Sequence, residues 1–254
     1  MVSAALFATA LYHPSSPLAA SISNEWVRRG VMGIAMGLTA VGIIYSPWGQ
    51  RSGAHMNPAV TLTFFRLGKV ERPDLIGYVL AQFAGGIAGI AICALLLGRF
   101  VSHPSINYVV TIPGAGGEVA AFLAETAMAF GMMIMILAVS NTPSLAKFTG
   151  LLAGLMVCSY IIVEAPVSGM SINPARTFGS ALLAGDYAGL WIYFTAPPLG
   201  MLLAAEVYAR SVGLHRVMCA KLHHPGCGSC IFGCDRRMRG AAHVHLTIPH
   251  HETA

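Results

Sequence analysis

Charged residues are scarce in this chain. Lys, Arg, Asp and Glu together make up 10% of its 254 residues, whereas soluble domains carry about 25%. Hydrophobic residues make up 56%, and the mean hydropathy is +0.67. These values exclude a soluble enzyme and indicate a membrane protein with several spans.

Motifs of catalysis and energy coupling are also missing. The chain has no Gly-x-Ser-x-Gly elbow, no His-Glu-x-x-His pair, no phosphate loop and no dinucleotide fingerprint. The net charge of +5 comes mainly from the basic C-terminal end, so it requires no nucleic-acid partner, and an anionic lipid leaflet is a simpler one. We therefore expect a protein that is not an enzyme, has no cofactor in its membrane part, and transports downhill.

Apolar runs alternate with short polar segments over the first 212 residues. Those near the ~20 residues that cross a bilayer cover 27–47, 75–98, 118–139, 148–166 and 190–209. A shorter run at 2–12 would cover only ~16 Å as a helix. We expect it to be a truncated sixth span that begins upstream of this sequence. A cleavable signal peptide is the rival, but the basic residues that should precede its apolar part are missing.

The tripeptide Asn-Pro-Ala occurs twice, as Asn57-Pro58-Ala59 and as Asn173-Pro174-Ala175. A Ser-Gly pair begins five residues before each Asn, and a half-length apolar run follows each triplet, at 58–65 and 174–183. The two Asn residues are 173 − 57 = 116 positions apart, close to half the chain. Such paired interruptions are typical of inverted-repeat membrane transport proteins, whose substrate path lies between the repeats.

Each triplet should begin a half-helix. Asn is a favoured N-cap, and Pro suits the first helical position because its missing N–H is not needed there. Two half-helices entering from opposite sides would meet with their positive dipole ends together. We expect both Asn amides to turn their N–H donors toward a water-filled path, which would disfavour proton relay and cation passage.

With these motifs the chain resembles the aquaporins, also called major intrinsic proteins. The matching stretches are SGAHMNPAVT at 52–61 and SGMSINPARTFGSAL at 168–182, and the resemblance extends over about 1–212. It implies an all-α membrane fold with six transmembrane helices, two re-entrant half-helices and an inverted repeat, 1–100 and 118–212. It also implies one pore per subunit and a homotetramer in the lipid bilayer.

The resemblance further implies a selectivity filter at the outer constriction. Arg176 directly follows the second triplet, and its counterparts in the family donate hydrogen bonds to the permeating molecule. The other filter positions are Met36, Ile161 and Met170, with Met36 assigned through one inserted residue at 45–51. Strict water channels of the family usually place an aromatic residue and a His where this chain has Met36 and Ile161. This difference argues against selectivity for water alone.

Three other positions favour a water channel. Glycerol facilitators of the family usually carry Asp where this chain has Thr177, a basic residue at Ala181, and Pro-Leu where it has Tyr193-Phe194. The sequence therefore predicts a passive water channel that excludes ions and protons, with leakage of small neutral solutes. The alternative is a facilitator for glycerol, urea or neutral metalloids.

Two polar residues near the triplets suggest supporting roles. His55 is expected to order the vestibule through hydrogen bonds, and a pH gate is the alternative for this residue. Glu125 lies within a span, where an ionisable residue is usually functional. The resemblance implies that Glu125 braces the half-helix loop through backbone hydrogen bonds.

Basic residues predict the orientation. With the C-terminal segment in the cytoplasm, eleven Lys and Arg residues lie inside and four lie elsewhere, as the positive-inside rule requires. We expect a multi-pass protein of the plasma or inner membrane with both termini in the cytoplasm.

The segment 213–254 differs in composition from the channel domain, 1–212. Six potential metal ligands lie within sixteen residues: Cys219, His223, His224, Cys227, Cys230 and Cys234. Their spacing suits a tetrahedral zinc site or an iron–sulfur cluster, and free or redox-sensitive thiols are the alternatives. If this segment carries the function, the chain is a metal- or redox-sensing membrane protein with a secondary pore.

Overall fold

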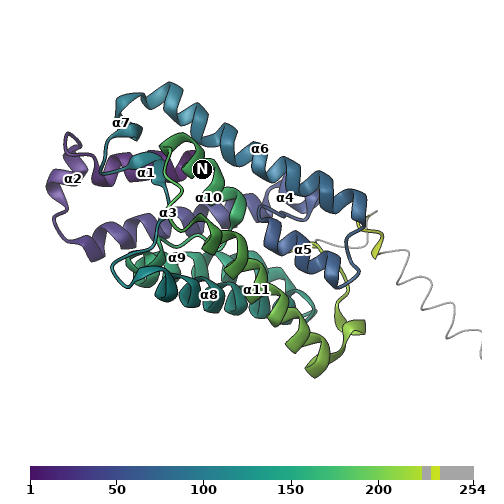
Figure 1. Cartoon of the computed structure of the whole chain (residues 1–254). Helices are drawn as coiled ribbons and strands as arrows, with labels where there is room; N and C mark the ends of the chain where they lie inside the picture. Colours follow the sequence, from purple (N-terminus) through teal and green to yellow (C-terminus); the bar gives the residue numbers. More distant parts are fainter. Residues whose placement is uncertain (225–229, 235–254) are drawn as a thin grey trace, which may run out of the picture.

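The computed structural model describes residues 1–224 and 230–234, and all regular secondary structure among them is helical (Figure 1). The long helices are α3 (Glu25–Tyr45), α6 (Arg72–Leu97), α8 (Gly117–Ser140), α9 (Thr149–Ser168) and α11 (Leu190–Tyr208). Within the described ranges these five helices are long and apolar enough to cross a membrane. The apolar α1 (Val2–Tyr12) has eleven residues, covers the short apolar run of the sequence and is shorter than the five candidate spans.

Short helical segments connect the long ones. They are α2 (Pro17–Ser21), α4 (Pro47–Ser52), α7 (Arg99–Ser102), η1 (Asn107–Val109), η2 (Ala146–Phe148), η3 (Ala209–Gly213) and η4 (Leu214–Arg216). Pro47 begins α4 instead of ending the preceding span, because Ser46 caps α4 by accepting a hydrogen bond from the Gly49 N–H. The chain therefore turns sharply at this point, immediately before the first Asn-Pro-Ala segment.

The two half-helices are α5 (Pro58–Arg66) and α10 (Pro174–Ala184), with nine and eleven residues. Both are too short to cross a bilayer about 30 Å thick. Figure 1 shows them in the interior of the bundle, with α6 on one side and α8 and α11 on the other. The all-α membrane architecture with two half-helices is the one that the sequence predicts.

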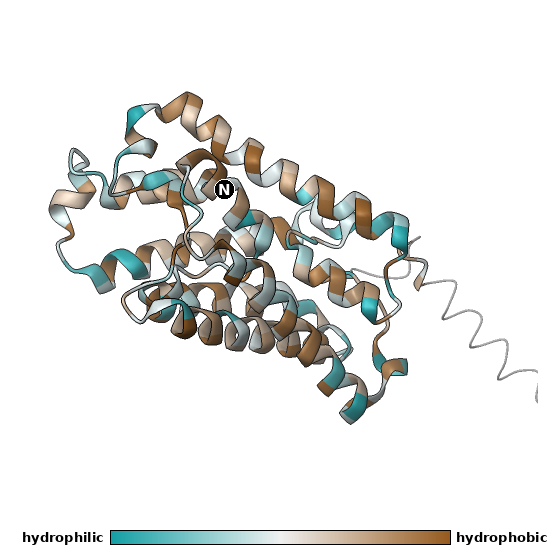
Figure 2. Ribbon diagram, viewed as in Figure 1, coloured by the Kyte–Doolittle hydropathy of each residue, from teal (hydrophilic) through white to brown (hydrophobic). Residues whose placement is uncertain are grey.

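The outer surface of the bundle is apolar. Figure 2 shows hydrophobic residues along the long helices and hydrophilic residues mainly at their ends. Leu80, Leu95 and Val119 are 66%, 85% and 74% exposed. Apolar surface of this kind suits contact with lipid or with a neighbouring subunit.

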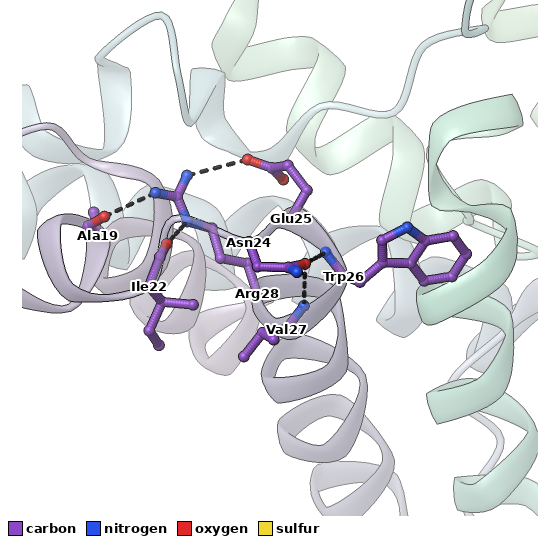
Figure 3. A network of polar contacts seen from close by, with 7 residues as sticks. All are labelled: Ala19, Ile22, Asn24, Glu25, Trp26, Val27 and Arg28. Atoms are coloured by element: carbon purple, nitrogen blue, oxygen red, sulfur yellow. Dashed lines mark hydrogen bonds and ion pairs between the residues drawn. The ribbon is translucent and has the colours of Figure 1, made fainter.

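A polar network fixes the start of α3 (Figure 3). The Asn24 side chain caps the helix by accepting a hydrogen bond from the Trp26 N–H at 2.8 Å. The Arg28 guanidinium donates to the carbonyl oxygens of Ala19 and Ile22 at 2.8 and 2.6 Å and pairs with Glu25 at 3.1 Å. Arg28 therefore holds the end of α2 and the segment that follows it against the first turn of α3.

Glycines allow the helices to approach closely at two places. A Cβ atom added to Gly37 of α3 would lie 2.6 Å from the Gly154 carbonyl oxygen of α9, and one added to Gly154 would lie 2.7 Å from that of Gly37. In α6, a Cβ on Gly86 would lie 2.6 Å from the Ala175 carbonyl oxygen at the start of α10. Membrane helices pack closely through small residues at such crossings, because lipid provides no hydrophobic driving force between them.

The two adjacent glycines of α6 provide a matched test of this packing. Gly86→Ala should destabilise the protein by about 1–3 kcal/mol, because the new methyl group must push α10 away. Gly85→Ala should be neutral or stabilising, because nothing lies within 4 Å of its added Cβ and Ala favours a helix. Thermal unfolding in detergent, followed by tryptophan fluorescence, measures the difference, and equal effects would contradict the packing described here.

Candidate functional site: two half-helices meeting at a cavity

Each half-helix begins at the Asn of its triplet. The Asn57 side-chain oxygen accepts a hydrogen bond from the Ala59 N–H at 2.9 Å. The Asn173 side-chain oxygen accepts from the Ala175 and Arg176 N–H groups at 3.1 and 3.3 Å. Pro58 and Pro174 occupy the first helical positions. The local sequence therefore forms the N-caps that it predicts.

The side-chain amides also connect the two half-helices to each other. Asn57 Nδ2 donates to the Ile172 carbonyl oxygen at 2.6 Å, and Asn173 Nδ2 donates to the Met56 carbonyl oxygen at 2.8 Å. This differs from the expectation that both amides turn all their donors toward the path. Because an amide nitrogen carries two N–H groups, each Asn keeps only one further donor.

The loops before the half-helices begin with matching backbone conformations. Gly53 and Gly169 both have positive φ, 80° and 76°, and so do the residues that follow, Ala54 at 58° and Met170 at 49°. This region favours glycine, and a non-glycine residue adopts it at a cost of about 1–3 kcal/mol. The repeat therefore extends to these two pairs of residues, whereas Ile172 of the second loop also has a positive φ, 46°, and its counterpart Met56 does not.

Two tyrosines hold these loops in place. Tyr78 of α6 donates its hydroxyl to the Ser52 carbonyl oxygen at 2.6 Å, and Tyr193 of α11 donates to that of Ser168 at 2.5 Å. Neither role was predicted from the sequence. A signal existed, since their separation of 193 − 78 = 115 positions is within one residue of the spacing between the triplets.

Glu125 of α8 braces the second loop. Its carboxylate accepts hydrogen bonds from the Ser168 hydroxyl at 2.7 Å and from the Ser171 and Ile172 N–H groups at 2.8 and 2.6 Å. These donors satisfy a fully buried carboxylate and fix the backbone immediately before Asn173. In the first loop, Gln82 Nε2 donates to the His55 carbonyl oxygen at 2.7 Å, a contact that sequence analysis did not predict.

A cavity of about 350 Å³ lies against the contact between the half-helices. Its lining includes Asn57 and Asn173 together with the four residues assigned to the filter, Met36, Ile161, Met170 and Arg176. The structure thus brings together in one wall side chains from α3, α9, α10 and both loops. Arg176 lines the cavity, and its buried Nη1 has no hydrogen-bond partner among the described residues.

His55 belongs to the first loop, and its side chain is buried, with the residue only 5% exposed. Its Nε2 donates to the Ala220 carbonyl oxygen at 2.7 Å, and its ring stacks with Phe64 and Phe232. Burial lowers the pKa of His55 to about 4, because a charged imidazole would lose its hydration there. His55 is therefore neutral at physiological pH, which argues against a pH gate near neutrality.

The C-terminal segment folds back against this same loop. Of its six candidate ligands, Cys219, His224, Cys230 and Cys234 come together. His223 instead packs against the Tyr45 ring, with ring centroids 4.8 Å apart. Cys227 lies outside the described residues, as do the histidines at 243, 245, 250 and 251.

Comparison with known proteins identifies the family. A model described as Major intrinsic protein matches residues 2–208. The chain belongs to this family. Aquaporin NIP1-1 of Arabidopsis thaliana is 37% identical to this major intrinsic protein over 178 residues, which are 69% of the chain and 60% of the relative. Aquaporin NIP2-2 of Zea mays is 40% identical over 194 residues, which are 75% of the chain and 64% of the relative.

The chain thus spans less than two thirds of the length of these two relatives. The solved structure of the aquaglyceroporin from Plasmodium falciparum has the same fold, with a TM-score of 0.69 and 22% identity. The likeness covers 85% of this chain and 92% of that one. Together with its apolar helices, the family match makes this major intrinsic protein a multi-pass membrane protein.

The state of His55 predicts a pH dependence of stability. A His that is neutral when folded, with a pKa of about 4, against about 6.5 when unfolded, contributes stability that is complete above pH 6.5. That stability is lost as the pH falls toward 4, because the unfolded chain binds the proton first. The unfolding temperature should therefore fall more steeply over this window in the wild type than in His55→Gln.

Permeability of reconstituted vesicles to water should not change through protonation of His55 between pH 8 and pH 5. A permeability step with a midpoint between pH 6 and 7 that disappears in His55→Gln would contradict the low pKa and restore the pH gate.

Proposed function

We propose that this chain is a passive channel subunit for water and small neutral solutes, and that it is not an enzyme. The carrying observation is the cavity whose lining combines Asn57, Asn173 and Arg176, which carry hydrogen-bond donors, with Met and aliphatic residues. A neutral molecule can accept these hydrogen bonds and place its apolar part against the wall. Relatives named aquaporins support a channel in this family.

Ion exclusion follows from the same arrangement. The N-terminal ends of α5 and α10 meet at the cavity, and each carries about half a positive charge. Arg176 adds a full positive charge to the same wall. Cations would meet this positive field, and the thioether and aliphatic groups cannot replace the hydration shell of an anion.

The facilitator alternative is favoured over the strict water channel. Met36, Ile161 and Met170, the residues that argue against water selectivity, all line the cavity. Thr177, Ala181 and Tyr193, which favour a water channel, are absent from that lining. Thr177 is buried against Ser171 and Thr111, and the Tyr193 hydroxyl holds a loop carbonyl. Because none of the three lines the cavity, we give them no direct part in the choice of solute.

The remaining features follow the family resemblance. We place the channel domain at 1–212 and the C-terminal segment at 213–254. We further propose that the protein lies in the plasma or inner membrane with both termini in the cytoplasm. The exposed apolar faces of α6 and α8 would contact lipid and the neighbouring subunits of a homotetramer.

Replacing the apolar constriction tests the proposed permeant range. In Met36→Trp combined with Ile161→His, glycerol and urea permeability should fall by about tenfold or more, the scale on which pocket substitutions change selectivity. Water permeability should fall much less. Stopped-flow light scattering on vesicles containing the full-length protein measures all three.

Ile161→Val serves as the control for this experiment, because it keeps an apolar wall and should retain solute permeability. Wild-type vesicles that admit water but no glycerol or urea would favour the strict water channel instead. Vesicles impermeable to all three would overturn the proposed function.

Arg176 is expected to exclude ions and protons. Arg176→Val should raise proton leakage, measured with an entrapped pH dye, by about tenfold or more, since the charge lies in a poorly hydrated wall. Water permeability should change much less. Arg51→Val is the control, because Arg51 is absent from the cavity lining. An unchanged leak in Arg176→Val would show that the half-helices alone exclude protons.

A further inference from the structure

The four ligating side chains of the C-terminal segment form a compact cluster. The sulfur atoms of Cys219, Cys230 and Cys234 and a ring nitrogen of His224 all lie within 4.8 Å of one another. The Cys219 and Cys230 sulfurs are 3.6 Å apart, and the Cys234 sulfur is 3.3 Å from His224 Nε2. A disulfide would require about 2.05 Å between sulfurs.

The two shorter separations, 3.6 and 3.3 Å, are close to the edges of a tetrahedron around one metal ion, and the 4.8 Å limit on the others leaves a small inward shift for the metal to make. With Zn–S bonds of about 2.3 Å and a Zn–N bond of about 2.0–2.1 Å, neighbouring ligand atoms lie about 3.4–3.8 Å apart. Three thiolates and one imidazole are a common ligand set of structural zinc sites. An iron–sulfur cluster would bind its cysteines to different irons, which requires a wider spread of sulfur atoms than this.

We propose that Cys219, His224, Cys230 and Cys234 bind a structural Zn²⁺ ion that fastens the C-terminal segment as a cap over the channel mouth beside the first Asn-Pro-Ala loop. The ligands come from two stretches, 219–224 and 230–234, which together form this cap.

The backbone around the ligands supports such a site. The Lys221 N–H points to the Cys219 sulfur at 3.4 Å, the kind of contact that steadies a metal-bound thiolate. Gly233 has a φ of 64° and closes a turn by donating its N–H to the Cys230 carbonyl oxygen at 2.9 Å. That turn brings Cys234 back beside Cys230. Cys230 and Cys234 are 7% and 4% exposed, as closed structural sites require.

Both stretches of the cap contact the channel loop. In the first stretch, the Ala220 carbonyl oxygen accepts from His55 and the Leu222 N–H donates to the Gly53 carbonyl oxygen at 3.2 Å. In the second, the Phe232 ring lies on those of His55 and Tyr78, with centroids 5.5 and 6.0 Å apart. A metal that joins the two stretches therefore fixes both against one loop.

Leu222 links the cap to the permeation path. It lies between the ligands Cys219 and His224, and its side chain lines the cavity together with Ala54 and Asn57. Because the cap places an apolar side chain in the wall at this end, the bound metal holds the channel mouth narrow. Removing the metal should release Leu222 and widen the mouth.

Metal content tests the site directly and does not depend on what the channel conducts. The full-length protein, purified without a polyhistidine tag, should contain about one zinc per chain by inductively coupled plasma mass spectrometry. Cys219→Ser, His224→Ala, Cys230→Ser and Cys234→Ser should each contain far less. His223→Ala is the matched control and should keep its zinc, because His223 packs against Tyr45.

Three results would overturn the site. They are iron with visible absorbance in place of zinc, a Cys219–Cys230 disulfide in the isolated protein, and zinc that persists in His224→Ala but is lost in Cys227→Ser. Loss of zinc in both His223→Ala and His224→Ala would also count against the ligand set.

Hydrogen exchange and permeability test the cap. Chelation of zinc should speed exchange of the Leu222 amide by about tenfold or more, because its bond to Gly53 opens locally. It should also raise permeability in stopped-flow measurements, and Leu222→Ala should raise permeability while keeping zinc. Unchanged exchange and permeability after complete removal of zinc would overturn the cap while leaving the proposed channel function intact.

Discussion

Two hydrogen bonds between the half-helices hold the centre of the molecule together. Asn57 donates to the carbonyl oxygen before Asn173, and Asn173 donates to the carbonyl oxygen before Asn57. Helix ends within a membrane must satisfy their backbone groups inside the protein. Each Asn does so twice, because its oxygen caps its own half-helix and its nitrogen binds the other loop. Asp lacks the donor for the second bond, and Gln would place the amide one methylene further away.

The two loops are braced in chemically different ways. Glu125 accepts backbone N–H groups of the second loop, so a side chain of a membrane helix fixes that loop. In the first loop the carbonyl oxygens of Gly53 and His55 accept hydrogen bonds from Leu222 and Gln82. One of these donors belongs to the C-terminal segment. The geometry of the first loop therefore depends in part on the C-terminal segment, and a change in that segment would reach the channel there.

The sequence predicted the features that depend on local chemistry. Asn-Pro-Ala forms an N-cap whatever surrounds it, and apolar length identifies a span. The reciprocal amide bonds were not predicted, because the partner of Asn57 is Ile172, 115 positions away. The roles of Tyr78 and Tyr193 could have been predicted only by applying the spacing between the two triplets to residues outside them. In the C-terminal segment, spacing identified candidate ligands but could not choose between His223 and His224, since only the fold decides which neighbour faces the cysteines.

The proposed passage of small neutral solutes as well as water rests on which residues make up the cavity wall. Arg176 and the two Asn amides provide donors next to Met36, Ile161 and Met170. Water that passes this wall loses hydrogen bonds on its apolar side, and each unmade bond carries a desolvation cost of about 1–3 kcal/mol. A polyol or urea-sized molecule loses fewer hydrogen bonds at this wall, because its carbon face makes none in water. That face also gains contact with the thioether and aliphatic groups. The same apolar groups that leave water partly unsatisfied therefore favour a solute with one polar and one apolar face. On the proposed function, the wall, and not the buried residues behind it, decides which molecules pass.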